Sequence, residues 1–176
     1  RLVLLFDQWL ESDRLNMAVN EINTTRIAIA PWLEELVETC RSYHAEHPIT
    51  LDRHLPQIYI EADDHLLQIA LLNLIDNACK YSPAGSVIEI RTETEQNRIG
   101  ICIKDSGCGI PEDQLDAVFE PYARGEHAQS TIKGVGLGLA FVNRIVQLHN
   151  GRIVIDSTPG MGTSITLWLP ILSTNS

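Results

Sequence analysis

The order of hydrophobic patterns along the chain predicts an α+β protein, a two-layer α/β sandwich in which three helices cover one face of a mixed, mostly antiparallel sheet. Two observations lead to this fold class. Strand-like and helical patterns follow one another as strand, helix, two strands, helix, two strands, helix, two strands. The later strands come in pairs around polar turns, which is typical of antiparallel pairing. Regular strand–helix alternation, the sign of a dinucleotide-binding fold, is missing.

Composition limits the classes of function that the chain can have. It has 176 residues, of which 44% are hydrophobic, and a formal net charge of −10 with a pI of about 4.9. This acidic balance argues against a nucleic-acid partner, because no basic stripe is available for a phosphate backbone. No apolar run approaches the ~18 residues that a membrane-spanning helix needs. The cysteines lack C-x-x-C spacing, so we expect reduced thiols rather than zinc at Cys40, Cys79, Cys102 and Cys108.

The apolar spacing in residues 1–19 predicts a helix with an apolar stripe. The stripe is formed by Leu2, Leu5, Phe6, Trp9 and Leu10. Nothing precedes it for the stripe to pack on, and the chain opens with arginine rather than methionine, so we expect the C-terminal remnant of a longer helix from a helical bundle. An ordinary first helix is the alternative. A polar linker over residues 16–25 leads into a single domain, expected over residues 20–172, and residues 173–176 form a loose tail.

The domain begins with a strand, a helix and two short strands. Residues 26–30 alternate between apolar and other side chains, as a strand does. Pro31 then suits the first position of a helix, whose apolar residues recur with a helical period up to Tyr43. Residues 49–52 and 57–61 are expected to be short strands.

A long central helix follows. Asp63 or Asp64 can cap its N-terminus. The helix is expected to end near Ser82, because the proline that comes next cannot continue it. Two alternating strands separated by a polar turn are expected over residues 87–93 and 99–104.

The last third contains an irregular stretch, a helix and a strand pair. Residues 111–133 show little apolar pattern, and a loop of this length inside a compact domain is usually functional or mobile. A helix is expected from about residue 135 to residue 148, stopped by Asn150-Gly151. The final strands are expected over residues 152–157 and 163–169.

The central helix carries the most informative stretch of the chain. With a period of 3.6 residues, Asn73, Asn77, Lys80 and Tyr81 fall on one narrow arc. The opposite face is apolar and is formed by Leu67, Leu71, Ile75, Ala78 and Cys79. Amide oxygens are hard ligands suited to Mg²⁺, an ammonium suits phosphate, and a phenol ring suits a base or sugar. A merely solvated helix face is the alternative.

A second candidate site follows the strand at residues 99–104. Asp105 continues the inward, apolar face of that strand by the period of two, so its carboxylate should point to the buried side. Burial of a carboxylate is costly unless a donor meets it, and the exocyclic amine of adenine would serve. Gly107 and Gly109 permit a tight turn and a close approach to a ring. Ordinary turn chemistry is the alternative.

Glycines mark two further candidate sites. The segment Gly134-Val-Gly-Leu-Gly138 precedes a helix, where bare backbone N–H groups can hold a phosphate. Arg124 and Lys133 lie in the same loop and could close over an anion, although either could be a solvated surface charge. Gly160-Met-Gly-Thr163 joins the last two strands and could equally be a plain hairpin turn.

Together these motifs resemble the catalytic, ATP-binding domain of bacterial sensor histidine kinases, within the Bergerat-fold group that includes gyrase and the Hsp90 chaperones. The resemblance covers residues 24–170. The matching boxes are residues 73–81 (N box), 105–110 (first glycine box), 119–122 (F box), 134–139 (second glycine box) and 160–163 (last glycine box).

The resemblance implies roles at the phosphate end of the site, with ATP and Mg²⁺ as the ligands. Asn77 would hold Mg²⁺ between the phosphates, with Asn73 nearby. Lys80 and Arg124 would contact phosphate. Tyr81 would lie against the adenosine.

The resemblance also implies the base end and a lid. Asp105 would accept from the adenine amine, assisted by Thr163, and residues 111–138 would form an ATP lid anchored by Phe119. The remaining residues expected at the nucleotide are Gly107, Gly109, Ile110, Lys133, Gly134, Val135, Gly136, Leu137, Gly138 and Leu139.

The sequence departs from a whole kinase because it lacks the phosphoacceptor. In the acceptor box of the family, an acid follows the histidine directly and a proline comes five residues on. Ala45 follows His44, Pro48 comes four residues on, and the other histidines lack the pattern too. The γ-phosphoryl group is therefore expected to pass to a helical domain elsewhere in the parent chain. The family also implies a homodimeric parent, a response regulator downstream, and a cytoplasmic domain of a protein anchored in the bacterial inner membrane.

Three other functions stay open at this point. A clamp-type Bergerat ATPase would need a carboxylate one helical turn before Asn77 to activate water, and Asn73 cannot act as a base. A nucleotide-binding regulator without catalytic activity and a serine kinase of the anti-sigma type would use the same motifs. The stripe in residues 1–19 favours the histidine kinase, because it implies an attached helical bundle.

Overall fold

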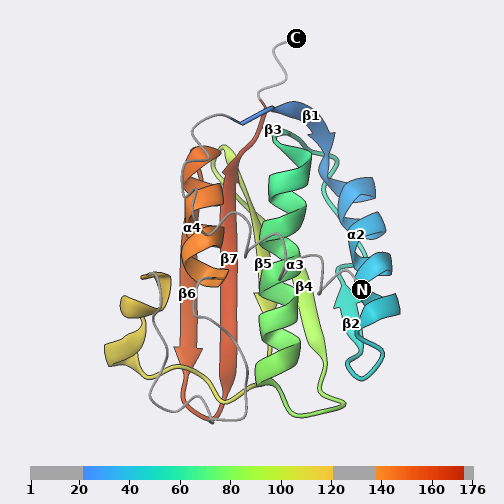
Figure 1. Cartoon of the computed structure of the whole chain (residues 1–176). Helices are drawn as coiled ribbons and strands as arrows, with labels where there is room; N and C mark the ends of the chain where they lie inside the picture. Colours follow the sequence, from blue (N-terminus) through green and yellow to red (C-terminus); the bar gives the residue numbers. More distant parts are fainter. Residues whose placement is uncertain (1–21, 121–137, 173–176) are drawn as a thin grey trace.

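Two layers make up the part of the chain that the computed structural model describes, residues 22–120 and 138–172 (Figure 1). One layer is a five-stranded sheet in the order β2-β4-β5-β7-β6. Its strands are β2 (Ile49–Leu51), β4 (Ile88–Glu95), β5 (Arg98–Lys104), β6 (Arg152–Thr158) and β7 (Gly162–Pro170). Only the β2–β4 pair of this sheet is parallel. The expected mixed, mostly antiparallel sheet is confirmed.

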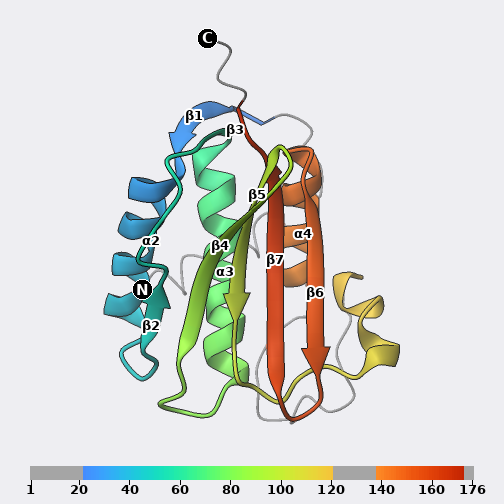
Figure 2. The same ribbon diagram turned by 180° about the vertical axis from the view of Figure 1, so that it is seen from behind.

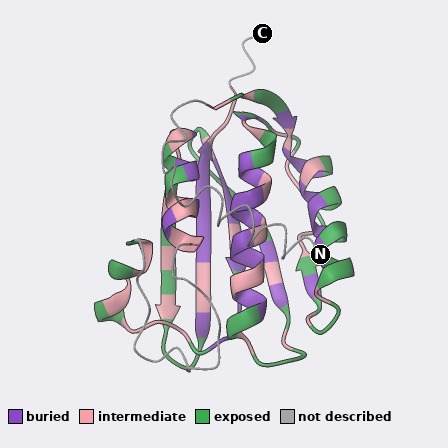
Figure 3. Ribbon diagram, viewed as in Figure 1, coloured by how far each residue is buried: buried purple, intermediate pink, exposed green. Residues whose placement is uncertain are grey.

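Three helices form the second layer, and they lie on one face of the sheet (Figures 1 and 2). They are α2 (Ile29–Tyr43), α3 (Asp64–Tyr81) and α4 (Gly138–Leu148). The core lies between the layers, where the purple segments of Figure 3 face one another. α3 occupies the centre of the helix layer, and its five predicted core residues are all buried. Among the described residues, no helix is long and apolar enough to cross a membrane.

The start of the domain has one feature that the sequence did not predict and one that contradicts the expectation. β1 (Thr25–Ala28) pairs only with β3 (Tyr59–Ala62), in a separate antiparallel sheet of two strands. The helix α2 begins at Ile29, so residues 29 and 30, expected in a strand, are helical. The reason is that Ile29 is completely buried as the first member of the apolar helical period. Pro31 is tolerated in this first turn, because a backbone N–H at this position would have no helical partner.

The boundaries of the central and last helices follow local hydrogen bonding. Asp63 is the N-cap of α3, because its side chain accepts from the N–H of Leu66 at 3.1 Å. Asn150, with φ of 53°, ends the turn after α4, and the N–H of Gly151 donates to the carbonyl of Val146 at 2.8 Å. These contacts confirm the predicted cap and the predicted stop.

The stretch after β5 is more regular than expected up to residue 120. It contains two short 3-10 helices, η1 (Glu112–Gln114) and η2 (Ala117–Phe119), and η2 lies against α4. Several predictions lie outside the described residues. They are the helix over residues 1–19, the rest of the irregular stretch, the helical residues 135–137 and the tail at residues 173–176.

Candidate functional site

The polar arc of α3 has two parts. Asn73 is buried, with 8% of its surface exposed, and its Oδ1 accepts from Nδ2 of Asn77 at 3.2 Å. Lys80 and Tyr81 are exposed at the last turn of the helix. The internal hydrogen bond fixes the amide of Asn77 so that its Oδ1 is turned away from Asn73. The arc therefore offers an oriented amide oxygen and, one turn later, an ammonium group.

The first residue of α4 packs directly on this arc. A Cβ added at Gly138 would lie 2.6 Å from Oδ1 of Asn73 and 2.9 Å from its Nδ2. Real side chains do not approach so closely, so any other residue at position 138 would force the Asn73 side chain or the start of α4 to shift. The sequence predicted Gly138 as part of a glycine-rich loop. The structure shows that it also holds Asn73, and through it Asn77, in place.

Asp105 stands at the end of β5, on the inward face of the sheet as predicted. It has 9% of its surface exposed. Its Oδ1 accepts from the N–H of Gly107 at 2.7 Å and from the N–H of Thr163 at 3.2 Å. Burial raises the pKa of the carboxyl, and these two hydrogen bonds oppose the rise only in part. No residue of the described ranges donates to Oδ2, which leaves that oxygen as an acceptor for a ligand.

Close backbone approaches join the Asp105 loop to its neighbours. A Cβ at Gly107 would lie 2.6 Å from the carbonyl oxygen of Tyr81, at the end of α3. Gly162, with φ of 101°, brings the β6–β7 hairpin so close that a Cβ there would lie 2.1 Å from the carbonyl oxygen of Asp105. The end of α3, the end of β5 and the hairpin therefore meet at one end of the molecule (Figure 1).

Ser157 is a site residue that the sequence analysis missed. Its Oγ accepts from the N–H of Ile110 at 2.8 Å and lies 2.8 Å from Oγ1 of Thr163. It also donates to the carbonyl of Gly162 at 3.1 Å. One hydroxyl thus fixes the Asp105 loop to the hairpin. The available signal was the register of the hairpin, in which Ser157 lies opposite Thr163.

The other predicted site residues divide by location. Gly109, with φ of 69°, lies in the same loop as Asp105 and approaches the carbonyl of Thr158. Phe119 is partly buried in η2, and Leu139 packs on the core from the first turn of α4. The remaining predicted residues fall outside the described ranges: Arg124, Lys133, Gly134, Val135, Gly136 and Leu137.

The glycine pair in the hairpin gives a matched test of this packing. Gly160 and Gly162 both have positive φ, but a Cβ at Gly160 would meet nothing within 4 Å. Both alanine variants should lose about 1 kcal/mol of stability from left-handed strain. Gly162→Ala should also displace Asp105 and weaken ligand binding, whereas Gly160→Ala should not. Thermal melts and ligand titrations would check this, and equal binding by both variants would contradict it.

A comparison with protein families decides the family. The model for histidine kinase-, DNA gyrase B- and HSP90-like ATPases matches residues 62–173, more than half of the chain. The chain belongs to this ATPase family. It is therefore an ATP-binding domain of that family, and the arc of α3, Asp105 and the hairpin all lie within the matched residues.

Relatives of this ATPase domain are sensor kinases. It is 32% identical over 175 residues to the sensor histidine kinase WalK of Bacillus subtilis, covering 97% of this chain and 28% of WalK. It is 35% identical over 167 residues to the adaptive-response sensory kinase SasA of Synechococcus elongatus, covering 92% of this chain and 42% of SasA. The domain thus spans less than half the length of these relatives.

Solved structures are also similar to this domain. The mycobacterial sensor histidine kinase MprB matches with a TM-score of 0.72 and 27% identity, over 85% of this chain and 98% of that one. Full-length ShkA in complex with AMPPNP matches with a TM-score of 0.75 and 24% identity, over 98% of this chain and 37% of that one. The second likeness concerns the fold alone.

Proposed function

We propose that this ATPase-family domain is the catalytic domain of a sensor histidine kinase, which transfers the γ-phosphoryl group of ATP to a histidine on a separate helical domain. The main support for a kinase is that position 73 holds an amide and not a carboxylate. A hydrolase would place a carboxylate one turn before the metal-binding asparagine. Asn73 cannot act as a base, and its Oδ1 already accepts from Asn77 at 3.2 Å. Position 73 therefore offers a bound ATP no carboxylate that activates water, which favours a kinase over a clamp-type ATPase.

The base end of the site supports ATP as the substrate. Oδ1 of Asp105 is held by two backbone N–H groups, so Oδ2 is the atom that would accept from the exocyclic amine of adenine. Thr163 lies beside it, with its N–H on the same carboxylate and its hydroxyl on Ser157. Tyr81, exposed at the end of α3, would lie against the adenosine. ADP would bind through the same groups.

The residues present fit Mg²⁺. Within the described ranges no three His, Cys, Asp or Glu side chains converge as a metal site. Mg²⁺ needs no such cage, because one or two protein oxygens commonly hold it together with substrate phosphates and water. Oδ1 of Asn77 is such an oxygen, since Nδ2 is engaged by Asn73. When bound, the metal ion would offset the charge that builds up on the phosphates.

Lys80 is the described cation of the polar arc, and its exposed ammonium would contact phosphate oxygens. Arg124 and Lys133, both outside the described residues, are proposed as further phosphate contacts from the lid. These side chains would bind and orient the γ-phosphoryl group, and the acceptor histidine would supply the nucleophile.

The proposal extends to the parent protein. We place the catalytic domain at residues 20–172, after residues 1–19 as the remnant of a dimerisation helix. The relatives are named as a sensor histidine kinase and a sensory kinase, which supports a sensor kinase as the parent. A parent that dimerises, carries the acceptor histidine upstream and passes its phosphoryl group to a response regulator is part of the same proposal. An anchor in the inner membrane with this domain on the cytoplasmic side belongs to the same proposal.

Phosphate release by the chain alone tests the assignment against its main rival. Incubated with γ-³²P-ATP and Mg²⁺, the chain should release phosphate slowly, because Asn73 provides no base. Its own six histidines should carry no acid-labile label. Rapid release would favour the clamp-type ATPase, and label on one of these histidines would show that the acceptor had been misassigned.

A further inference from the structure

A buried histidine ties two helices together at the end of the molecule opposite the nucleotide loops. His149 follows α4 and has 4% of its surface exposed. Its Nε2 lies 2.9 Å from the N–H of Asp63, and its Nδ1 lies 2.7 Å from the carbonyl of Ile145. Asp63 is the N-cap of α3. The imidazole therefore joins the end of α4 to the start of α3.

The two contacts fix the state of the ring. A backbone N–H can only donate, so Nε2 must be the acceptor, and Nδ1 must carry the proton that it donates to Ile145. Asp63 is itself held, because its carboxylate accepts from the N–H of Leu66 at 3.1 Å and from the N–H of Asn23 at 2.9 Å. His149 thus contacts a residue that cannot move without breaking the α3 cap.

The lengths of the two helices link this contact to the nucleotide site. α3 and α4 pack side by side and run in opposite directions (Figure 1). From Asp63 to Asn73 the helix rises by about 15 Å, and from Gly138 to His149 by about 16.5 Å, at roughly 1.5 Å per residue. The two spans agree to within about one residue. One position of α4 along the axis of α3 therefore satisfies both contacts, His149 with Asp63 at one end and Gly138 with Asn73 at the other.

We propose that His149 is a positioning residue for the magnesium-binding amide of Asn77. It sets the register of α4 on α3, which seats Gly138 against Asn73, and Asn73 orients Asn77 through the 3.2 Å hydrogen bond. A slip of α4 by one residue, about 1.5 Å, would separate Gly138 from Asn73. The inference rests on the proposed function, because it assigns His149 an effect on the metal-dependent part of ATP binding.

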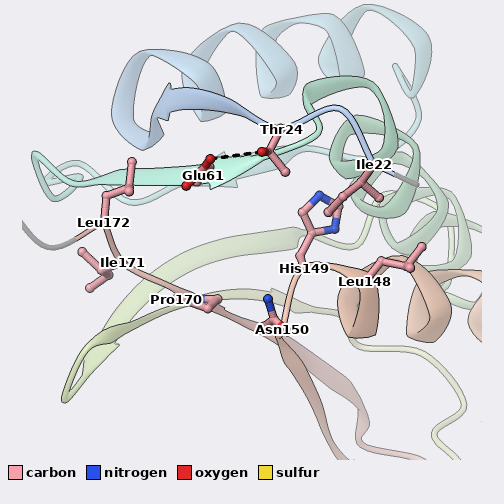
Figure 4. A pocket seen from close by; sticks show the side chains of 9 residues that line it. All are labelled: Ile22, Thr24, Glu61, Leu148, His149, Asn150, Pro170, Ile171 and Leu172. Atoms are coloured by element: carbon pink, nitrogen blue, oxygen red, sulfur yellow. Dashed lines mark hydrogen bonds between the residues drawn. The ribbon is translucent and has the colours of Figure 1, made fainter. Parts of the chain in front are cut away.

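The surroundings of His149 make a substitution practical. Its ring forms part of the wall of a cavity of about 300 Å³, together with Ile22, Leu148 and Leu172 (Figure 4). The cavity gives room for the slightly larger ring of phenylalanine. His149→Phe keeps an aromatic ring but can neither accept from Asp63 nor donate to Ile145. His149→Gln keeps one acceptor and one donor and serves as the conservative rescue.

The test separates positioning from stability. ATP affinity is measured with and without Mg²⁺ for the whole chain and its variants. In His149→Phe the gain from Mg²⁺ should fall by about fivefold, while affinity without Mg²⁺ should stay within about twofold. His149→Gln should restore most of the gain. Val37→Ala, a cavity in the buried face of α2, should lower the melting temperature without changing the gain.

A second variant changes the contact at the other end of α4, between Gly138 and Asn73. Gly138→Ala forces a Cβ against Asn73 and should also reduce the gain from Mg²⁺. Gly138 is itself expected at the nucleotide, so only the ratio of the affinities with and without Mg²⁺ is compared for this variant. If His149→Phe does not fold, His149→Asn replaces it, because its shorter side chain does not reach the N–H of Asp63. Should these variants keep the full Mg²⁺ gain of the wild type, the positioning role is overturned and the proposed function stands. A wild type without any gain from Mg²⁺ would instead overturn the proposed function.

Discussion

Asp105→Asn should weaken ATP binding by at least about tenfold while leaving the fold intact. A hydrogen bond to a charged group contributes roughly 1.5–3 kcal/mol, or about 12-fold to 150-fold in affinity. The geometry makes the amide especially unfavourable. Two backbone N–H groups already point at Oδ1, so the asparagine would place its carbonyl there. Its NH₂ group would then occupy the position of Oδ2 and face the adenine amine, donor against donor.

Isothermal titration calorimetry with ATP measures this loss. Asp156→Asn is the matched control, since Asp156 is an exposed carboxylate on β6 within the same family match. The control should bind ATP like the wild type. Unchanged affinity in Asp105→Asn would refute the role of Asp105 in base recognition.

The same substitution has a predictable effect on stability. Burial raises the pKa of Asp105 above its ordinary value, despite the hydrogen bonds from Gly107 and Thr163. The ionised carboxylate therefore disfavours the folded state at neutral pH, and this cost disappears as the pH falls through the raised pKa. Asp105→Asn should be at least as stable as the wild type at pH 7, and any advantage should shrink at lower pH. Melting temperatures across this range would check the sign.

Asn77→Ala should abolish the metal-dependent part of ATP binding, a loss of at least about tenfold in the presence of Mg²⁺. The alanine removes the oriented Oδ1 and also leaves Oδ1 of Asn73 without its 3.2 Å partner. Affinity in the absence of Mg²⁺ should change little, because the proposed contact of Asp105 with the base is retained.

A fluorescent ATP analogue, titrated with and without Mg²⁺, measures both quantities in one series. Asn97→Ala is the control, an exposed asparagine in the turn between β4 and β5. It should keep the full difference between the two titrations. If Asn77→Ala also kept that difference, Asn77 would not be the metal ligand.

Local periodicity explains why much of the site could be predicted. The arc of α3 follows from a 3.6-residue period over a long segment, and the inward direction of Asp105 follows from a two-residue period over Arg98–Lys104. Both periods depend only on near neighbours in the chain. Burial confirms the predicted core face of α3 and the inward direction of Asp105, whereas Asn73, on the polar arc, is buried as well.

Contacts between distant segments explain what the sequence could not predict. Alternation identified β1 and β3 as strands but gave no sign that they would form a two-stranded sheet of their own. Ser157 looked like any hydroxyl beside a hairpin, although its Oγ bridges Ile110 and Thr163. His149 meets Asp63 across 86 residues of sequence, and no local pattern encodes that contact.

Phosphoryl transfer to a separate acceptor tests the kinase assignment most directly. The chain is incubated with γ-³²P-ATP, Mg²⁺ and a purified dimeric helical domain that carries a histidine followed by an acid. Because the two parts are not linked, the reaction should be weak and should rise with concentration. We expect label on the acceptor that is lost in acid, that needs Mg²⁺ and that disappears with Asn77→Ala. An unlabelled acceptor beside rapid release of free phosphate by the chain would contradict the assignment.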